Sequence, residues 1–349
     1  MASVPIAPPV TKEYFFEGDM KLRFEQEQKV SKIGGRIVGG QPGNNPPLMI
    51  GNMFWPGDKI VESRKEGKFN REEATNQIRK LEVLEKKTGL PSLVDMVANT
   101  GDEMKRYIDF FVEATVESQM PFSSDAYKTE VKRPSAEHVA SLGMMDRYLY
   151  NSLSFWEKEL EKEIEDIAKL GVKHVVLGLW DAQDDFSTGR LKCLDNMWKL
   201  LEPYKFETIL CDCSVMSLPT SMICNISMEM IKEKYGFPSG SGPANGVYMW
   251  MKNAKEIGGK EAFAGADVAA EAVSSLGADW LMYGPVDAMD RIFPGVAIAQ
   301  CNFAAMAMDQ YKELPENPNH PFHLLFPDVV KQFHDKLAGV EKKRKWLKK

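Results

Sequence analysis

The chain has 349 residues, of which 44% are hydrophobic, and this is enough for one large α/β barrel or for two ordinary domains. Its net charge of −6 argues against a nucleic-acid-binding protein, because such proteins neutralise phosphates with lysine and arginine. The five cysteines form no CxxC pair and have no zinc-ligand spacing, so we expect reduced thiols in a cytoplasmic protein.

Neither end of the chain predicts a targeting or membrane segment. The N-terminus lacks the basic-then-apolar order of a secretory signal. The most apolar late stretch, Ala297 to Met308, contains Gln300 and Asn302 and is too short and too polar to span a bilayer. We therefore expect no membrane span.

The first half of the chain alternates apolar runs with amphipathic runs. The turn-rich stretch from Ile33 to Gly43 predicts an N-terminal β-hairpin that closes the bottom of a barrel. A strand is expected over 48–54, and Asn70 then caps a helix that ends before Gly89. The later strands of this half are expected over 92–98, up to 124 and over 148–152. Its later helices are expected after the capping boxes Thr100/Glu103 and Ser154/Glu157, and over 135–142.

The second half continues the same alternation. Its expected strands lie over 173–179, 207–212, 237–241 and 280–283. Its expected helices cover 191–201, a run ending at 235, 247–257, 268–276 and 286–311. A proline-rich turn over 314–322 and a terminal helix over 326–346 follow the last of them.

Eight strand–helix units with apolar strands favour a parallel (β/α)8 TIM barrel over a doubly wound open sheet. The polar residues at the strand ends follow strands from all round the ring, whereas an open sheet gathers them at one switch point. We divide the chain into an N-terminal extension and hairpin (1–45), a barrel (46–300) and a C-terminal helical appendage (301–349).

Aspartate and asparagine alternate at the ends of four of these strands, as Asp125, Asn151, Asp212 and Asn245. Each aspartate alone could simply cap the next helix. Together, two carboxylates and two carboxamides suit a flat, nitrogen-rich ring such as a pterin. A carboxylate accepts the exocyclic amine and the ring N–H as a fork, each bond contributing about 1.5–3 kcal/mol.

Other motifs give weaker signals. The glycine-rich run from Gly240 to Gly246 lacks the Lys-Ser/Thr of a P-loop and the spacing of a dinucleotide site. The five histidines have no metal-pair spacing, so we expect no metal bound by this chain. The chain also lacks an Asp-x-His-x-x-Gly sequence, which would supply the lower ligand of a corrinoid.

The chain resembles the pterin-binding methyltransferases, and most of all the H subunits of tetrahydromethanopterin S-methyltransferase and related corrinoid-dependent tetrahydrofolate enzymes. The resemblance covers roughly residues 22 to 300. It rests on four segments: Ile33 to Gly43, Val-Val-Leu-Gly178, Tyr-Gly-Phe-Pro-Ser-Gly-Ser-Gly242 and Leu-Met-Tyr-Gly-Pro285.

The resemblance implies methyl transfer between N5 of a tetrahydropterin, the co-substrate, and a corrinoid carried by a separate partner protein. It implies that five residues bind the pterin, namely Asp125, Asn151, Asp212, Ser241 and Asn245. It further implies that Asp125 and Asn245 are catalytic, with Asn245 near N5, and that the chain forms a homodimer. Two alternatives stay open: an enzyme of the dihydropteroate synthase type, with Lys128 and Lys132 as its pyrophosphate ligands, and a non-catalytic pterin-binding subunit.

Overall fold

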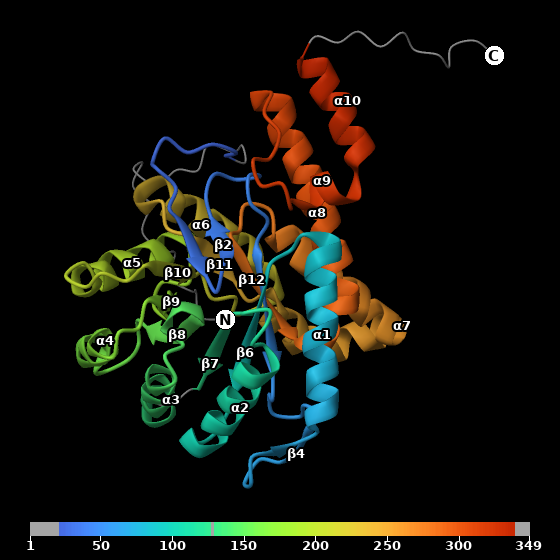
Figure 1. Ribbon diagram of the computed structural model, residues 1–349. Helices are drawn as coiled ribbons and strands as arrows, with labels where there is room; N and C mark the ends of the chain where they lie inside the picture. Colours follow the sequence, from blue (N-terminus) through green and yellow to red (C-terminus); the bar gives the residue numbers. More distant parts are fainter. Residues whose placement is uncertain (1–20, 127–128, 339–349) are drawn as a thin grey trace, which may run out of the picture.

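The computed structural model describes residues 21–126 and 129–338, and in this part eight parallel strands close into a barrel (Figure 1). In order round the ring from the first, the strands are β3 (Leu48–Met53), β6 (Ser92–Val97), β7 (Phe122–Asp125), β8 (Tyr148–Ser154), β9 (His174–Gly178), β10 (Thr208–Asp212), β11 (Ser239–Ser241) and β12 (Trp280–Pro285). The predicted TIM barrel is confirmed.

Eight helices of the described chain lie outside the strands; the first seven connect each barrel strand to the next, and the eighth follows β12. They are α1 (Arg71–Thr88), α2 (Gly101–Ala114), α3 (Thr129–Ser141), α4 (Leu160–Lys169), α5 (Ser187–Leu201), α6 (Ser221–Tyr235), α7 (Pro243–Ser274) and α8 (Met289–Tyr311). Helix α7 joins the two helices predicted there and has non-helical backbone at Gly258 and Gly259. Glycine permits this break because it tolerates a positive φ.

Two of the three predicted capping residues are confirmed by their hydrogen bonds. The side chain of Asn70 accepts from the backbone N–H of Glu73 at 3.0 Å, and that of Thr100 accepts from the N–H of Glu103 at 3.2 Å. The capping box predicted at Ser154 is wrong. Helix α4 begins six residues later at Leu160, and no side chain caps it.

A second hairpin was not predicted. After β3, the chain forms a small antiparallel hairpin of β4 (Val61–Ser63) and β5 (Lys68–Phe69) before α1 begins. Both strands are very short and carry little apolar alternation, which is the signal that sequence reading depends on. The hairpin extends the loop at the carboxyl end of β3 (Figure 1).

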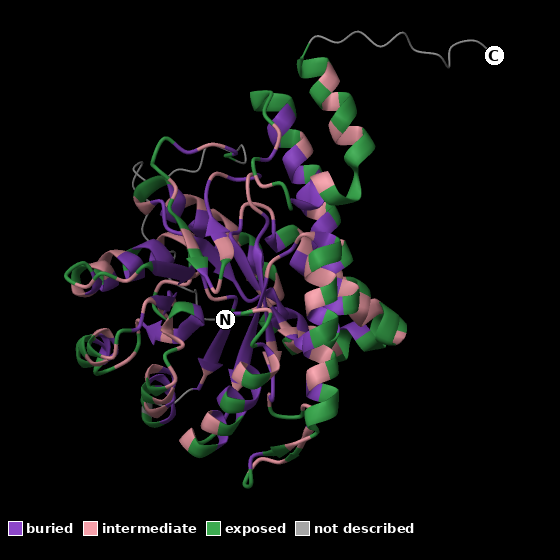
Figure 2. Ribbon diagram, viewed as in Figure 1, coloured by how far each residue is buried: buried purple, intermediate pink, exposed green. Residues whose placement is uncertain are grey.

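The barrel strands are buried on both faces, as Figure 2 shows, because helices cover their outside and side chains fill their inside. The inner core combines residues of the barrel strands with two residues of the N-terminal hairpin, β1 (Val30–Ile33) and β2 (Arg36–Gly39). Ile33 and Val38 of this hairpin are fully buried in the inner core. The hairpin therefore closes the bottom of the barrel, as predicted.

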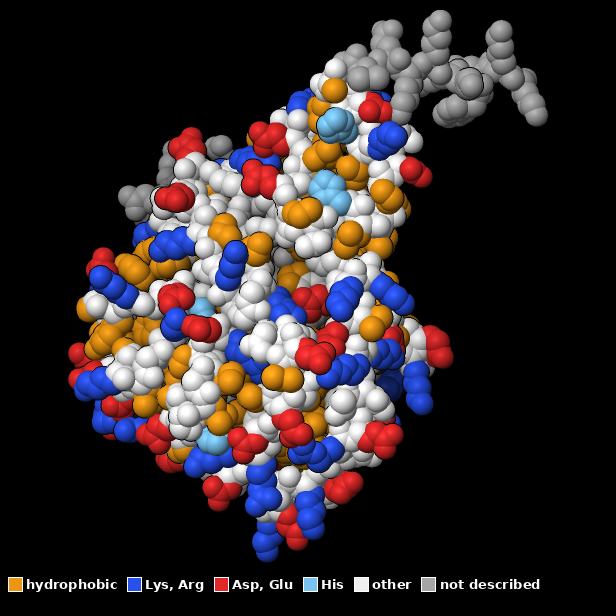
Figure 3. Space-filling model, viewed as in Figure 1, with side chains coloured by type: hydrophobic (Ala, Val, Ile, Leu, Met, Phe, Trp, Pro, Cys, Tyr) orange, Lys and Arg blue, Asp and Glu red, His pale blue; other side chains and the backbone are white. Residues whose placement is uncertain are grey.

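The chain continues beyond the barrel as a C-terminal arm, residues 312–338, which contains α9 (Pro321–Leu325) and α10 (Pro327–Leu337). Phe322 packs on Cys301 and Ala304 of α8, whereas α10 has no buried residue. Figure 3 shows hydrophobic side chains gathered on this arm. The predicted end of the terminal helix, at Trp346, lies outside the described residues, and the predicted boundary at 300 falls inside α8 and stays a prediction.

One helical stretch of the described residues, Val286–Tyr311, is long and apolar enough to cross a membrane by length and composition. Of its most apolar window, 56% is buried inside the protein. The stretch contains α8, which packs against both α7 and α1. This is the position of the eighth outer helix of the barrel.

A glycine fixes where the C-terminal arm meets the barrel. Gly89 has a φ of +77°, and a Cβ atom placed there would lie 1.9 Å from the carbonyl oxygen of Asn319 in the arm. We expect Gly89→Ala to destabilise the protein by about 3 kcal/mol or more, since it adds this clash to the cost of a left-handed alanine. Gly171→Ala is the matched control, because Gly171 has a φ of +80° and open space around it. Urea unfolding should show a loss of only about 1–2 kcal/mol for the control, and equal losses would contradict the contact.

Candidate active site

The inside of the barrel changes from apolar to polar towards the carboxyl ends of the strands. Side chains two residues apart on a strand face the same way, so each inner-core residue is followed by a second inward residue nearer the mouth. The apolar-to-polar pairs are Ile50 and Asn52, Leu93 and Asp95, Leu149 and Asn151, and Leu210 and Asp212. The ends of β3, β6, β8 and β10 therefore form a polar layer above an apolar floor, whereas β12 continues with the apolar Met282.

Asp95 is the centre of this polar layer and is not among the predicted site residues. It is fully buried, and its carboxyl accepts hydrogen bonds from Asn52 Nδ2 at 2.8 Å, Asn151 Nδ2 at 3.3 Å and the Ser123 hydroxyl. Burial, and then the nearby charge of Asp125, raise the pKa of Asp95 well above its usual range. The network fixes the orientation of Asn151 by holding its amide nitrogen.

Asp125 and Asn151 lie side by side, because the last residue of β7 is in register with Asn151 of β8. Within the described residues, no hydrogen bond is made to the Asp125 carboxyl or to Asn151 Oδ1. Burial raises the pKa of Asp125 to about 6, and the charge of Lys132 opposes this shift. These two groups are therefore available to a ligand.

Asp212 ends β10 and starts a tightly held loop. Its Oδ1 accepts the backbone N–H of Ser214 at 2.8 Å and its Oδ2 accepts the Ser214 hydroxyl at 3.3 Å, and burial raises its pKa to about 6. The buried Arg190 donates to the carbonyl oxygens of Cys213 at 2.5 Å and Ser214 at 3.1 Å, and pairs with Asp185 at 3.0 Å. This clamp fixes the loop and leaves Asp212 with unused acceptor positions.

The remaining two predicted residues, Asn245 and Ser241, lie on different sides of the barrel wall. Asn245 is exposed in the first turn of α7, directly after β11. Ser241 is fully buried and is in register with Leu281 of the neighbouring strand β12. Leu281 belongs to the hydrophobic core between the strands and the surrounding helices, so Ser241 also lies on the side of β11 that faces the helices. The geometry brings Asp125, Asn151, Asp212 and Asn245 to the same face of the barrel and separates Ser241 from them.

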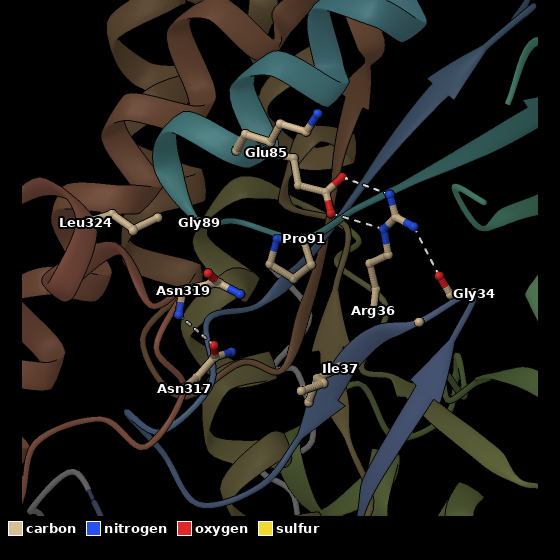
Figure 4. Close-up of a pocket in the computed structure, with 11 residues that line it drawn as sticks. Gly34, Arg36, Ile37, Glu85, Gly89, Pro91, Asn317, Asn319 and Leu324 are labelled. Carbon is tan, nitrogen blue, oxygen red and sulfur yellow. Dashed lines mark hydrogen bonds and ion pairs between the residues drawn. The ribbon is translucent and has the colours of Figure 1, made fainter. Parts of the chain in front are cut away.

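A cavity of about 430 Å3 lies elsewhere, between the N-terminal hairpin, the end of α1 and the C-terminal arm (Figure 4). Arg36 lines this cavity, and its guanidinium group pairs with Glu85 at 3.0 Å and donates to the carbonyl oxygens of Gly34 and Ser118. None of the predicted site residues lines this cavity. In residues 21–126 and 129–338, no three His, Cys, Asp or Glu side chains gather as a metal site would require.

Comparison with known proteins gives the family. Residues 26–314 match the sequence model of the family described as "Tetrahydromethanopterin S-methyltransferase MtrH subunit". The chain belongs to this family. The match ends before α9, so the helices of the C-terminal arm lie beyond the part that defines the family.

Among curated members of the family, the H subunit of tetrahydromethanopterin S-methyltransferase from Methanosarcina barkeri is 29% identical over 314 residues, covering 86% of this chain and 98% of the relative. The corresponding protein of Methanothermobacter marburgensis is also 29% identical, covering 87% of this chain and 99% of the relative. The family assignment supports a role in a methyltransferase.

Solved structures with a similar fold include dihydropteroate synthases. The Yersinia pestis enzyme, solved with a pterine-sulfa conjugate, has a TM-score of 0.55 and 14% identity, covering 78% of this chain and 99% of that one. The Thermus thermophilus enzyme has a TM-score of 0.52 and 14% identity, covering 80% of this chain and 100% of that one. At such identities the likeness shows the barrel fold alone.

Proposed function

We propose that this chain transfers a methyl group between a corrinoid held by a separate protein and N5 of a tetrahydropterin. The observation that carries the proposal is a group of acceptors at the carboxyl ends of neighbouring strands: Asp125 and Asn151 Oδ1, which accept no hydrogen bond from the described residues, and Asp212, whose two oxygens each accept one bond from Ser214 and keep a second acceptor position. Membership of the H-subunit family supports the same reaction. Tetrahydrofolate and tetrahydromethanopterin are both candidate co-substrates.

In this proposal the pterin ring lies across the polar layer. Asp212 accepts the exocyclic amine and the neighbouring ring N–H, and Asp125 accepts a further ring N–H. Asn151 presents its Oδ1, because Asp95 holds its Nδ2. Each charge-assisted bond contributes about 1.5–3 kcal/mol, so these residues are sufficient to orient a small ring. The position of Ser241 on the outer side of β11 gives it no contact in this arrangement.

The proposed chemistry needs alignment more than acid or base catalysis. N5 of a reduced pterin is already a nucleophile, so its lone pair takes the methyl group as the cobalt–carbon bond breaks and that bond's electron pair stays on the cobalt. N5 then releases its proton to water, and the step requires no activating base. Fixing the reacting atoms in line can lower the barrier by up to about 7–11 kcal/mol. Asn245 extends from the start of α7 and would hydrogen-bond N5; in the reverse direction it would help to deliver the proton that N5 needs to leave.

The proposal predicts that Asn245→Ala lowers kcat about 10²-fold and changes pterin affinity by less than about threefold, since Asn245 acts at N5 and not on the amine edge. Demethylation of free methylcobalamin, followed by absorbance with each pterin in turn, measures kcat. Asn253→Ala is the matched control, because Asn253 is an exposed asparagine two turns further along α7. A wild-type chain that demethylates methylcobalamin with neither pterin would refute the proposed function.

The structure weakens the alternative of a dihydropteroate synthase reaction, which needs a free cation for pyrophosphate. Lys132 is 3% exposed, pairs with Glu163 at 2.7 Å and donates to the carbonyl oxygen of Ser152 at 2.9 Å. Lys128 lies outside the described residues. A non-catalytic pterin-binding subunit stays as the second alternative, and turnover of free methylcobalamin by the isolated chain would exclude it.

A further inference from the structure

Large apolar side chains are exposed on four successive loops at the carboxyl ends of the strands. Trp156 follows β8, Phe186 follows β9, Met216 follows β10, and Met249 lies one turn after Asn245 on α7. Their exposed fractions are 54%, 66%, 38% and 72%. We call these four residues the apolar arc. It covers half of the mouth, from β8 to β11.

The segments that follow three other barrel strands differ from the apolar arc. None of the exposed large hydrophobic residues of the described chain lies in the segments that follow β3, β6 and β12, which are 54–70, 98–100 and 286–288. The segment after β3 instead exposes charged side chains, namely Lys59, Glu62, Lys65, Glu66 and Lys68. The apolar arc is therefore a one-sided feature and not a general property of these loops.

Two positions of the apolar arc are anchored although they are exposed: the ring of Trp156 and the backbone of Phe186. Trp156 lies over the end of β9, where a Cβ at Gly178 would come within 3.1 Å of its ring, and it packs edge-to-face on Trp180 at 6.2 Å. Arg190, the residue that clamps the Asp212 loop, also donates to the carbonyl oxygen of Phe186 at 3.2 Å. Aromatic groups that are already ordered lose little entropy when a partner covers them.

We propose that the apolar arc is the surface on which the corrinoid-carrying protein docks, an inference that rests on the proposed function. A methyl group carried by a protein reaches the pterin only if that protein covers the mouth, so side chains on the rim become buried in the complex. The arc borders the part of the mouth that holds Asp212 and Asn245, where N5 would lie. Exposed aromatic and methionine side chains are the types enriched in the centres of such interfaces.

Acidic residues beside the apolar arc indicate which charge the facing surface of the partner should carry. The loop that leads to Phe186 carries three acidic residues, Asp181, Asp184 and Asp185. Asp184 and Asp185 pair with Lys192 and Arg190 of the chain itself. The matching face of the partner is therefore apolar with a basic edge opposite Asp181.

The test compares a carrier protein with free cofactor. The double variant Phe186→Ser/Met249→Ser changes the two most exposed residues of the arc, and Val83→Ser/Val116→Ser changes two exposed valines on α1 and after α2, away from the mouth. Methyl transfer is measured with free methylcobalamin and with a methylated corrinoid protein purified from the source organism. Binding of that protein to each variant is measured separately by biolayer interferometry.

We expect the arc variant to raise KM for the corrinoid protein and Kd for its binding at least about tenfold, with turnover of free methylcobalamin within about twofold of wild type. The valine variant should leave all three values unchanged. Unchanged KM and Kd in the arc variant would overturn the docking surface while leaving the proposed function intact. Absence of turnover in the wild type would refute the proposed function, and the binding measurement would still decide whether the arc is the docking surface.

Discussion

Asp212→Asn is expected to weaken binding of a tetrahydropterin about 10²-fold. The variant replaces an acceptor-only carboxylate with an amide, so one arm of the proposed fork is lost and an N–H group faces a ring N–H. The loss of one charge-assisted bond and the added repulsion together reduce the binding free energy by roughly 3 kcal/mol. Isothermal titration at pH 8 measures the change. The bond from the backbone of Ser214 survives, because the asparagine Oδ1 can still accept it.

The same variant is expected to be more stable than the wild type above pH 6. Burial raises the pKa of Asp212 to about 6 from 3.8, so the folded wild type loses stability as pH rises from about 4 to 6. The substituted amide does not ionise, and the gain should grow through this window to about 1–3 kcal/mol. Urea unfolding at pH 4, 6 and 8 measures it.

Asp181→Asn is the matched control for both effects. The Asp181 carboxylate accepts the backbone N–H of Gln183 at 2.9 Å, in the same local geometry as Asp212 and Ser214, but it lies in a more solvent-accessible loop. Its substitution should change neither pterin affinity nor the free energy of unfolding at pH 8. If Asp212→Asn behaves like this control, Asp212 is only a structural residue of its loop.

The fold was predictable because its signals are local. Apolar strands, the caps at Asn70 and Thr100, and the glycine-rich N-terminal hairpin each follow from a few neighbouring residues. The failure at Ser154 has a local cause as well, since β8 runs through Ser154 and the chain turns before Leu160. The capping-box pattern alone does not distinguish the start of a helix from the end of a strand that extends two residues further than expected.

The site was only partly predictable, because its centre depends on register. Asp125 and Asp212 end their strands and are visible as polar residues after apolar runs. Asp95 lies inside β6, and its partners Asn52 and Ser123 come from two neighbouring strands, so the network exists only once the barrel is closed. A charged residue within an apolar strand was the available signal. Register also separates Ser241 from the mouth, which the sequence does not reveal.

Lys232→Met is expected to destabilise the protein by about 3–5 kcal/mol at pH 8, because it leaves a buried carboxylate without its partner. Lys232 on α6 is 2% exposed and lies 2.5 Å from Asp279, which is 8% exposed and also accepts the backbone N–H of Ser239 at 2.8 Å. Asp279 directly precedes β12, and its carbonyl oxygen accepts the N–H of Leu48. The pair therefore ties together three strands at the bottom of the barrel.

Lys234→Met is the matched control, since Lys234 is two residues further along α6 and pairs with Asp195 at the surface. That substitution should lower the free energy of unfolding by less than about 1 kcal/mol. Burial raises the pKa of Asp279 and Lys232 opposes this, so without the lysine the carboxyl takes up a proton more easily. The loss caused by Lys232→Met should therefore shrink as pH falls from 8 to 5, and Lys232→Met/Asp279→Asn should recover much of it. Equal losses for the two lysine variants would mean that the buried pair does not stabilise the barrel.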